Sequence, residues 1–169
     1  RVDRGIVRTM DEVEIIGIAD TNARTNALQT GQIDFMNRCE LKTVHMLKRA
    51  PKIQIIKVNS TFHYTLPMFM DVAPFNNNDV RLALKYAIDR KQIVEKILRG
   101  YGTVGNDHPI APIMKYYAAD LPQRTYDPDK AKFHLKKANL SDLTVALHTA
   151  PLANFIDAAL LYKENATKA

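Results

Sequence analysis

The sequence predicts an α/β fold, in which strands and helices alternate along the chain. Short β-rich runs lie at Glu14–Ile18, Ile33–Met36 and Ile53–Val58, and helical patterns separate them. A succession of strand, helix, strand, helix and strand is typical of a layered sheet with crossover helices. The chain has 169 residues and a hydrophobic fraction of 46%, which is enough for an ordinary domain with a sizeable core.

The helices between these runs have clear start and stop signals. Asp20 is expected to cap a helix that Gly31 closes, with Arg24 as a partly covered surface residue of that helix. A second helical face carries Leu41, Val44 and Leu47, and it ends before Pro51, which cannot continue a helix.

Two consecutive helices are predicted between residues 74 and 100. Asn78 is expected to cap the first, and Asp79 favours the positive end of that helix. Asp89, with Gln92 three residues on, predicts a restart by a variant of the capping box, and Gly100 is the expected left-handed stop. The apolar stripes of this pair are Val80, Ala83, Leu84, Ala87 and Ile88, then Ile93, Val94, Ile97 and Leu98.

The remaining elements alternate in the same way. Phe62–Met70 is β-rich but contains Pro67, which places it at a sheet edge or a bend. Residues 101–112 form a turn-rich loop of the kind on which binding groups concentrate. The last three elements are a helix with Asp127 as cap, Pro128 first and Asn139 after its end; a strand with Leu143, Val145 and Leu147 on one face; and a helix with Leu152, Phe155, Ile156, Ala159 and Leu160 inward.

Charge and composition exclude several classes of protein. The net charge is +6, but the densest basic patch lies on one helix without aromatic residues placed to stack on bases, which indicates a solvated face rather than a nucleic-acid site. No run approaches the ~20 apolar residues of a membrane span, and no signal-peptide pattern opens the sequence. The protein is either cytosolic or exported by a signal outside this sequence. The basic patch consists of Lys130, Lys132, Lys136 and Lys137.

No catalytic or metal-binding motif is present, so neither a cofactor nor an enzymatic activity is expected. Cys39 is the only cysteine; it excludes an intrachain disulfide and is expected to be a small core residue. The carboxylates show no pairing suited to acid–base chemistry. The histidines share no metal-ligand spacing and are His45, His63, His108, His134 and His148.

Three segments closely resemble the family 5 extracellular solute-binding proteins, the dipeptide, oligopeptide and nickel receptors of ABC importers. The longest is the V-R-x-A-L-x-x-A-I-D-R string with the I-V and L-x-G-Y-G that follow. The second has the pattern D-x-x-A-R-x-x-A-L-x-x-G-x-I-D, and the third begins Y-D-P. In order, the matching residues are Val80, Arg81, Ala83, Leu84, Ala87, Ile88, Asp89, Arg90, Ile93, Val94, Leu98, Gly100, Tyr101 and Gly102; Asp20, Ala23, Arg24, Ala27, Leu28, Gly31, Ile33 and Asp34; and Tyr126, Asp127, Pro128, Lys130, Ala131 and Leu135.

The resemblance implies an internal fragment of a longer protein with the type II periplasmic-binding fold, in which two α/β lobes enclose a cleft. On this interpretation residues 1–60 end the first lobe, 61–72 cross between the lobes and 73–169 begin the second. The crossing lies beside the cleft, which makes His63 and Tyr64 candidate ligand contacts. The loop after the helix pair approaches the same cleft, which adds Asn106, Asp107 and His108. Packing on the sheet explains the first two equally well, and turn chemistry explains the Asn–Asp pair.

The function implied is that of a periplasmic or extracellular receptor, lipid-anchored in some members, that captures short peptides and delivers them to the membrane subunits of an ABC importer. A receptor of the same fold for a nickel chelate, a sugar or another solute is the first alternative. A free-standing basic interaction domain with an acidic partner is the second.

Overall fold

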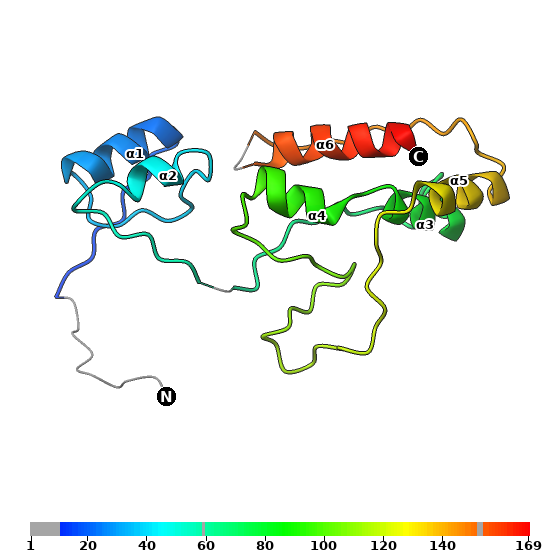
Figure 1. The fold of residues 1–169 in the computed structure, drawn as a ribbon, viewed down its shortest axis with the longest axis horizontal. Helices are drawn as coiled ribbons and strands as arrows, with labels where there is room; N and C mark the ends of the chain where they lie inside the picture. Colours follow the sequence, from blue (N-terminus) through cyan, green and yellow to red (C-terminus); the bar gives the residue numbers. More distant parts are fainter. Residues whose placement is uncertain (1–10, 59, 152–153) are drawn as a thin grey trace. The chain divides into compact units, whose positions relative to one another are not determined.

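The computed structural model describes residues 11–58, 60–151 and 154–169. It divides into two compact units, of which the first ends at Glu40 and the second is Leu41–Ala169. Figure 1 shows helices joined by long irregular segments. In chain order the elements are α1 (Thr21–Thr30), α2 (Val44–Leu47), α3 (Asn78–Tyr86), α4 (Arg90–Gln92), one π-helical turn η1 (Ile93–Ile97), α5 (Pro128–Lys137) and α6 (Phe155–Lys168).

The first unit contains α1, and its predicted ends are confirmed. The Asp20 side chain accepts a hydrogen bond from the Ala23 amide at 2.7 Å. Gly31 has φ 74° and closes the helix, because a residue without a Cβ adopts this left-handed conformation without strain. Arg24 is half-buried, as expected, and its guanidinium donates to the Ile18 carbonyl at 2.8 Å.

The cap of α3 is one residue earlier than predicted. The Asn77 side chain, not that of Asn78, accepts from the first-turn amide of Asp79 at 2.8 Å. Asn78 already belongs to the first helical turn, and its side-chain oxygen instead accepts from the Arg81 guanidinium at 3.0 Å. Both asparagines have the chemistry of a cap, so only the backbone path into the helix decided between them.

The second helix of the pair begins as predicted and then widens. Asp89 caps it by accepting from the Gln92 amide at 3.0 Å, while the Gln92 side chain donates to the other Asp89 oxygen at 2.9 Å. The Leu98 amide reaches the Ile93 carbonyl at 2.9 Å, five residues back, which is the π-helical pattern. Gly100 ends the element with φ 77°.

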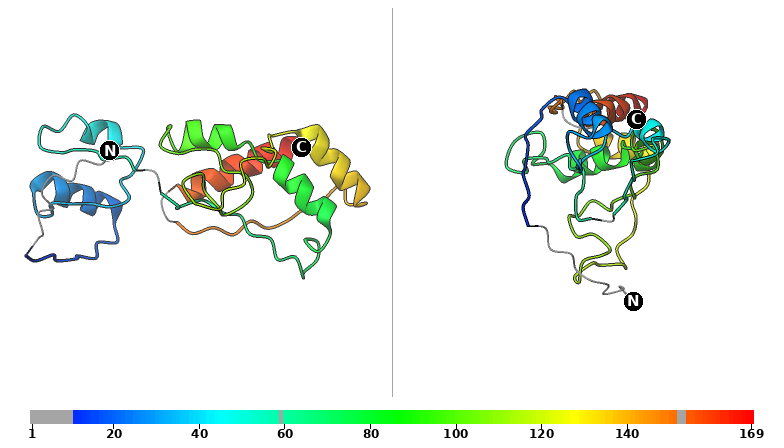
Figure 2. Two further views of the ribbon diagram at one scale, coloured as in Figure 1. Left: turned by 90° about the horizontal axis from the view of Figure 1, so that it is seen from below. Right: turned by 90° about the vertical axis from the view of Figure 1, so that its left-hand side faces the viewer.

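The core of the second unit lies where α3 packs against α5 and η1 packs against α6 (Figure 2). Val80 is fully buried, and Ala83, Ala87 and Ala131 are at most 4% exposed. The predicted apolar face of α3 is therefore confirmed. Val44 and Leu47 of the short α2 are also buried, as their spacing predicted.

The inward face predicted for α6 is wrong in part. Ile156 and Leu160 are 46% and 60% exposed, whereas Asn154, Leu161 and Asn165 are buried. Polar contacts favour this rotation of the helix: Tyr162 donates to the Leu84 carbonyl at 2.9 Å, and the Asn165 carbonyl accepts from the Tyr126 hydroxyl at 3.1 Å. Phe155 and Ala159 are half-buried, and Leu152 lies outside the described residues.

Helix α5 matches its predicted boundaries. The Asp127 side chain accepts from the Lys130 amide at 2.9 Å, and Pro128 is the first helical residue. Asn139 follows the helix with φ 57°. The basic face is solvated as expected, since its four lysines are exposed.

No strand occurs in the described residues, so the α/β expectation is not confirmed. A β-strand requires the backbone of a neighbouring strand to bond its amides and carbonyls, and the predicted runs find no such ladder in the described part of the chain. Ile15 is 92% exposed, Val58 73% and Phe69 72%. The runs that were predicted as strands and are irregular here are Glu14–Ile18, Ile33–Met36, Ile53–Val58, Phe62–Met70 and Leu143–Leu147.

Candidate functional site

The loop that follows η1 is centred on Asp107, one of the predicted binding residues. One oxygen of its carboxylate accepts from the Arg90 guanidinium and the other from the Arg124 guanidinium. The three side chains are only 14%, 15% and 25% exposed in the order Asp107, Arg90 and Arg124. Two arginines on one carboxylate satisfy both of its oxygens, and partial burial strengthens the attraction.

This arginine–aspartate clamp attaches the loop to the end of α3. Arg90 also donates to the Lys85 carbonyl at 3.1 Å. The Arg124 guanidinium lies 5.3 Å from the centre of the Tyr86 ring, a cation–π contact. The clamp thus fixes where the loop leaves the helices.

Two amide side chains close the same loop. Asn106 donates to the Leu121 carbonyl at 3.2 Å, and Gln123 donates to the Gly105 carbonyl at 3.0 Å. His108 lies with its ring 5.7 Å from that of Tyr117, and its Nε2 is buried without a hydrogen-bond partner. The segment between these closures is a preformed loop rather than a loose connection.

The other predicted pair lies in the irregular segment before α3. His63 is exposed, and its Nδ1 is 2.8 Å from the Thr61 carbonyl oxygen. The Tyr64 ring packs edge-on against Phe155 at 4.5 Å. Within the described ranges, the partners of this pair are Thr61, Phe62 and Phe155, whereas Asn106, Asp107 and His108 contact Leu121, Arg90, Arg124 and Tyr117. The structure therefore does not assemble the five predicted residues into one cluster.

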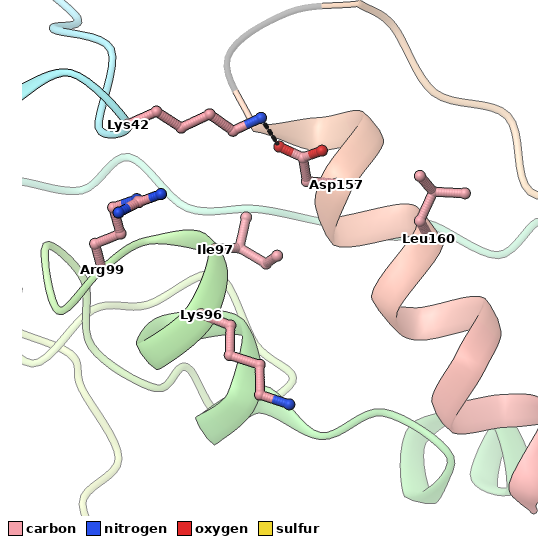
Figure 3. A pocket seen from close by; sticks show the side chains of 6 residues that line it. All are labelled: Lys42, Lys96, Ile97, Arg99, Asp157 and Leu160. Atoms are coloured by element: carbon pink, nitrogen blue, oxygen red, sulfur yellow. Dashed lines mark ion pairs between the residues drawn. The ribbon is translucent and has the colours of Figure 1, made fainter.

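A hollow of about 270 Å³ lies between the end of η1 and the first turns of α6 (Figure 3). The Lys42 ammonium is 2.6 Å from the Asp157 carboxylate across one side of it. Sequence reasoning missed this site, because its residues come from three separate segments of the chain and Arg99, with φ 49°, lies beyond the end of η1. The lining residues are Lys42, Lys96, Ile97, Arg99, Asp157 and Leu160.

The surroundings of several titratable groups shift their pKa values. Burial raises the pKa of the Tyr162 phenol to about 12, so the group stays protonated. Burial, assisted by the charge of Glu40, also raises the pKa of the half-buried Cys39 thiol, which disfavours the reactive thiolate. Among the described residues, no group of three or more His, Cys, Asp or Glu side chains is arranged to hold a metal ion. None of their helices is long and apolar enough to cross a bilayer.

The profile of a known family covers nearly the whole sequence. "Bacterial extracellular solute-binding proteins, family 5 Middle" matches residues 5–168. The chain belongs to this family. Membership confirms the resemblance of the helix pair and implies the type II periplasmic-binding fold, although the strands of that fold do not form in the described residues.

Curated relatives of this family 5 chain match it over a comparable stretch. Heme-binding protein A of Haemophilus influenzae is 31% identical over 129 residues, which are 76% of this chain and 23% of that protein. Glutathione-binding protein GsiB of Escherichia coli is 32% identical over 129 residues, 76% of this chain and 25% of the relative. GsiB of Salmonella choleraesuis is 29% identical over 133 residues, which are 79% of this chain and 26% of that protein. The chain spans about a quarter of the length of these relatives.

Proposed function

We propose that this chain is part of the substrate-binding component of an ABC importer, and that the assembled receptor captures short peptides. The match of residues 5–168 to the family of extracellular solute-binding proteins is the observation that carries the proposal. Relatives named for glutathione, itself a tripeptide, favour a peptide as the solute. The receptor works outside the cytoplasmic membrane, in the periplasm or at the cell surface.

In this proposal the cleft lies between two lobes, with residues 1–60 ending one lobe, 61–72 crossing and 73–169 beginning the other. Solute contacts made only in the closed form shift an open–closed equilibrium toward it. The closed form then docks on the importer's membrane subunits, which perform the energy-driven step. In this proposal the receptor binds and releases its solute unchanged, without a catalytic step.

The five predicted residues border the cleft from two segments. His63 and Tyr64 contribute from the crossing, and Asn106, Asp107 and His108 from the loop. The Asp107 carboxylate is already paired with Arg90 and Arg124. In this proposal Asp107 therefore holds the loop in place, and its neighbours contact the peptide. At these residues the main-chain groups of the peptide would then be bound, with little discrimination among side chains in this part of the cleft.

Calorimetry with di- to pentapeptides tests the proposal on both this chain and the longer protein that contains it. We expect saturable binding by the longer protein and weak or no binding by the 169-residue chain, which lacks much of the cleft in this interpretation. Strong binding by the short chain would show that the site is misplaced. Indifference of the longer protein to every peptide would overturn the peptide assignment.

A different solute is the second candidate, favoured by the relative named for heme. Titration of the longer protein with heme, followed by its absorbance, separates the two candidates. A free-standing basic domain is the third, and it predicts binding of acidic polymers that falls steeply with salt, whereas a buried peptide site responds weakly to salt.

A further inference from the structure

We propose that the hollow between η1 and α6 binds a carboxylate-bearing side chain of the captured solute, so that the receptor prefers acidic peptides. This inference rests on the proposed function and adds a substrate class to it. The hollow lies entirely within the second unit, and Figure 3 shows the charged and apolar side chains that line it.

The charges of the hollow are unbalanced. Lys42, Lys96 and Arg99 bring three cations, and Asp157 is the carboxylate among the lining residues. Asp157 pairs with Lys42 at 2.6 Å. Lys96 donates to the neutral Gln92 amide oxygen at 2.9 Å, a contact that orients the ammonium but does not neutralise it.

Lys96 also interacts electrostatically with one carboxylate outside the hollow, that of Glu164. The charge of Lys96 contributes to lowering the pKa of Glu164, but the main cause is the hydrogen bond from Lys168. Glu164 and Lys168 form their own ion pair at 2.6 Å. The nearby acid is therefore already paired, and the hollow keeps an excess of positive charge.

Further cations surround the residues that follow Arg99. The Lys57 ammonium donates to the Gly100 carbonyl at 3.2 Å. The Lys48 and Lys57 ammonium groups lie 5.2 and 5.7 Å from the centre of the Tyr101 ring. Like charges gathered in this way repel one another, and an anion among them relieves that repulsion.

The volume of the hollow and its apolar lining residues select the kind of anion that fits. A volume of about 270 Å³ is at the small end of ligand sites and suits one side chain rather than a protein surface. Ile97 and Leu160 are the apolar lining residues, and the methylene groups of a glutamate would lie against them. A carboxylate in the hollow would then meet the Arg99 guanidinium, whose fork geometry carboxylates match. The Lys96 ammonium points to a different side of the hollow from Arg99 (Figure 3) and adds its positive charge from there.

The test compares the peptides Ala-Glu-Ala and Ala-Gln-Ala by calorimetry at low ionic strength, using the longer protein. They share both termini and the same shape, so their difference isolates the side-chain charge. We expect the glutamate peptide to bind about fivefold more tightly, the size of one to two partly exposed ion pairs. Equal affinities, with both peptides bound, would overturn the carboxylate site and leave the proposed function standing. Binding of neither peptide would overturn both.

One double variant and a matched double-variant control locate the effect. Changing Lys96→Met together with Arg99→Met is expected to abolish the preference while the glutamine peptide binds as before. Lys132→Met with Lys136→Met removes the same charge from the exposed face of α5 and should preserve the preference. A preference that survives the first pair, or is lost equally in the second, refutes the site.

Asp157→Asn supplies a gain that a merely structural role would not produce. Removing this carboxylate raises the positive charge of the hollow, so affinity for the glutamate peptide should increase about twofold or more, with no change for the glutamine peptide. An unchanged or lower affinity for the glutamate peptide, in a variant with wild-type circular dichroism, counts against the proposal.

Discussion

Helix α3 and the irregular run Ile53–Val58 both carry valine and other aliphatic side chains, yet the environments of their two valines are opposite. Val80 on α3 is 0% exposed, whereas Val58 in the run Ile53–Val58 is 73% exposed. A helix bonds its own backbone and needs only a packing partner for one face, which α5 gives to α3. A strand needs a backbone partner as well. Where none is present, apolar alternation alone neither forms a ladder nor buries its side chains.

The largest expected effect comes from making the same substitution in both regions. Val80→Ala should destabilise the protein by about 2 kcal/mol, because it removes buried methyl groups and leaves a cavity. Val58→Ala should change stability by no more than about 0.5 kcal/mol. Urea unfolding followed by circular dichroism measures both. Equal losses would mean that Val58 is buried in solution and that the contrast between the regions is wrong.

An intermediate effect is expected at the clamp, which joins the ordered helices to the loop. Asp107→Asn removes the charge that pairs with Arg90 and Arg124 and should cost about 1–2 kcal/mol, between the values of exposed and buried ion pairs. Asparagine tolerates the φ of 53° at this position, so the backbone is not strained.

Asp120→Asn, at an exposed site of the same loop, is the matched control and should be nearly neutral. Limited proteolysis of residues 101–124, together with urea unfolding, reports the difference. Loop cleavage that is no faster in the Asp107 variant than in the control would show that the clamp does not hold the loop.

The smallest effect is a pH dependence within the helix cluster. His134 hydrogen-bonds Asp79 at 2.8 Å and, with Lys137, lowers the pKa of that carboxyl. A folded-state pKa below the unfolded one gives stability that is present above about pH 4, the unfolded value, and is lost as the pH falls through the folded value.

Asp79→Asn should therefore lose less stability than the wild type on acidification below about pH 4. Urea unfolding at a series of pH values measures this. The lowered pKa values of Asp127 and Glu164 act in both proteins and cancel in the comparison. If the free energy of unfolding changes with pH in the same way in both proteins, the His134–Asp79 pair does not stabilise the fold.

Local chemistry explains which parts of the fold could be predicted. The caps at Asp20, Asp89 and Asp127 and the left-handed stops at Gly31 and Gly100 depend on residues within a few positions of each other. The Asn77 cap was misplaced by one residue because Asn77 and Asn78 offer the same group. The strands were not realised, because their ladders depend on partners distant in sequence.

The sequence likewise predicted some features of the candidate site and missed others. Turn-forming residues indicated an ordered loop at 101–112, but nothing in their spacing revealed that Asp107 lies between Arg90 and Arg124, each 17 residues away. The hollow escaped sequence reasoning because Lys42 and Asp157 are far apart along the chain. The five predicted binding residues stay predictions.

The sequence by itself determined most of the helix caps and stops and, through its signature strings, the family to which the chain belongs. Those features are encoded over a single helical turn or in a contiguous string. Only the tertiary structure decided which face of α6 is buried and which carboxylate the two arginines share. It also decided where a hollow is lined by more cations than carboxylates. Each of these depends on the distance between residues remote in sequence, and folding, not spacing along the chain, sets that distance.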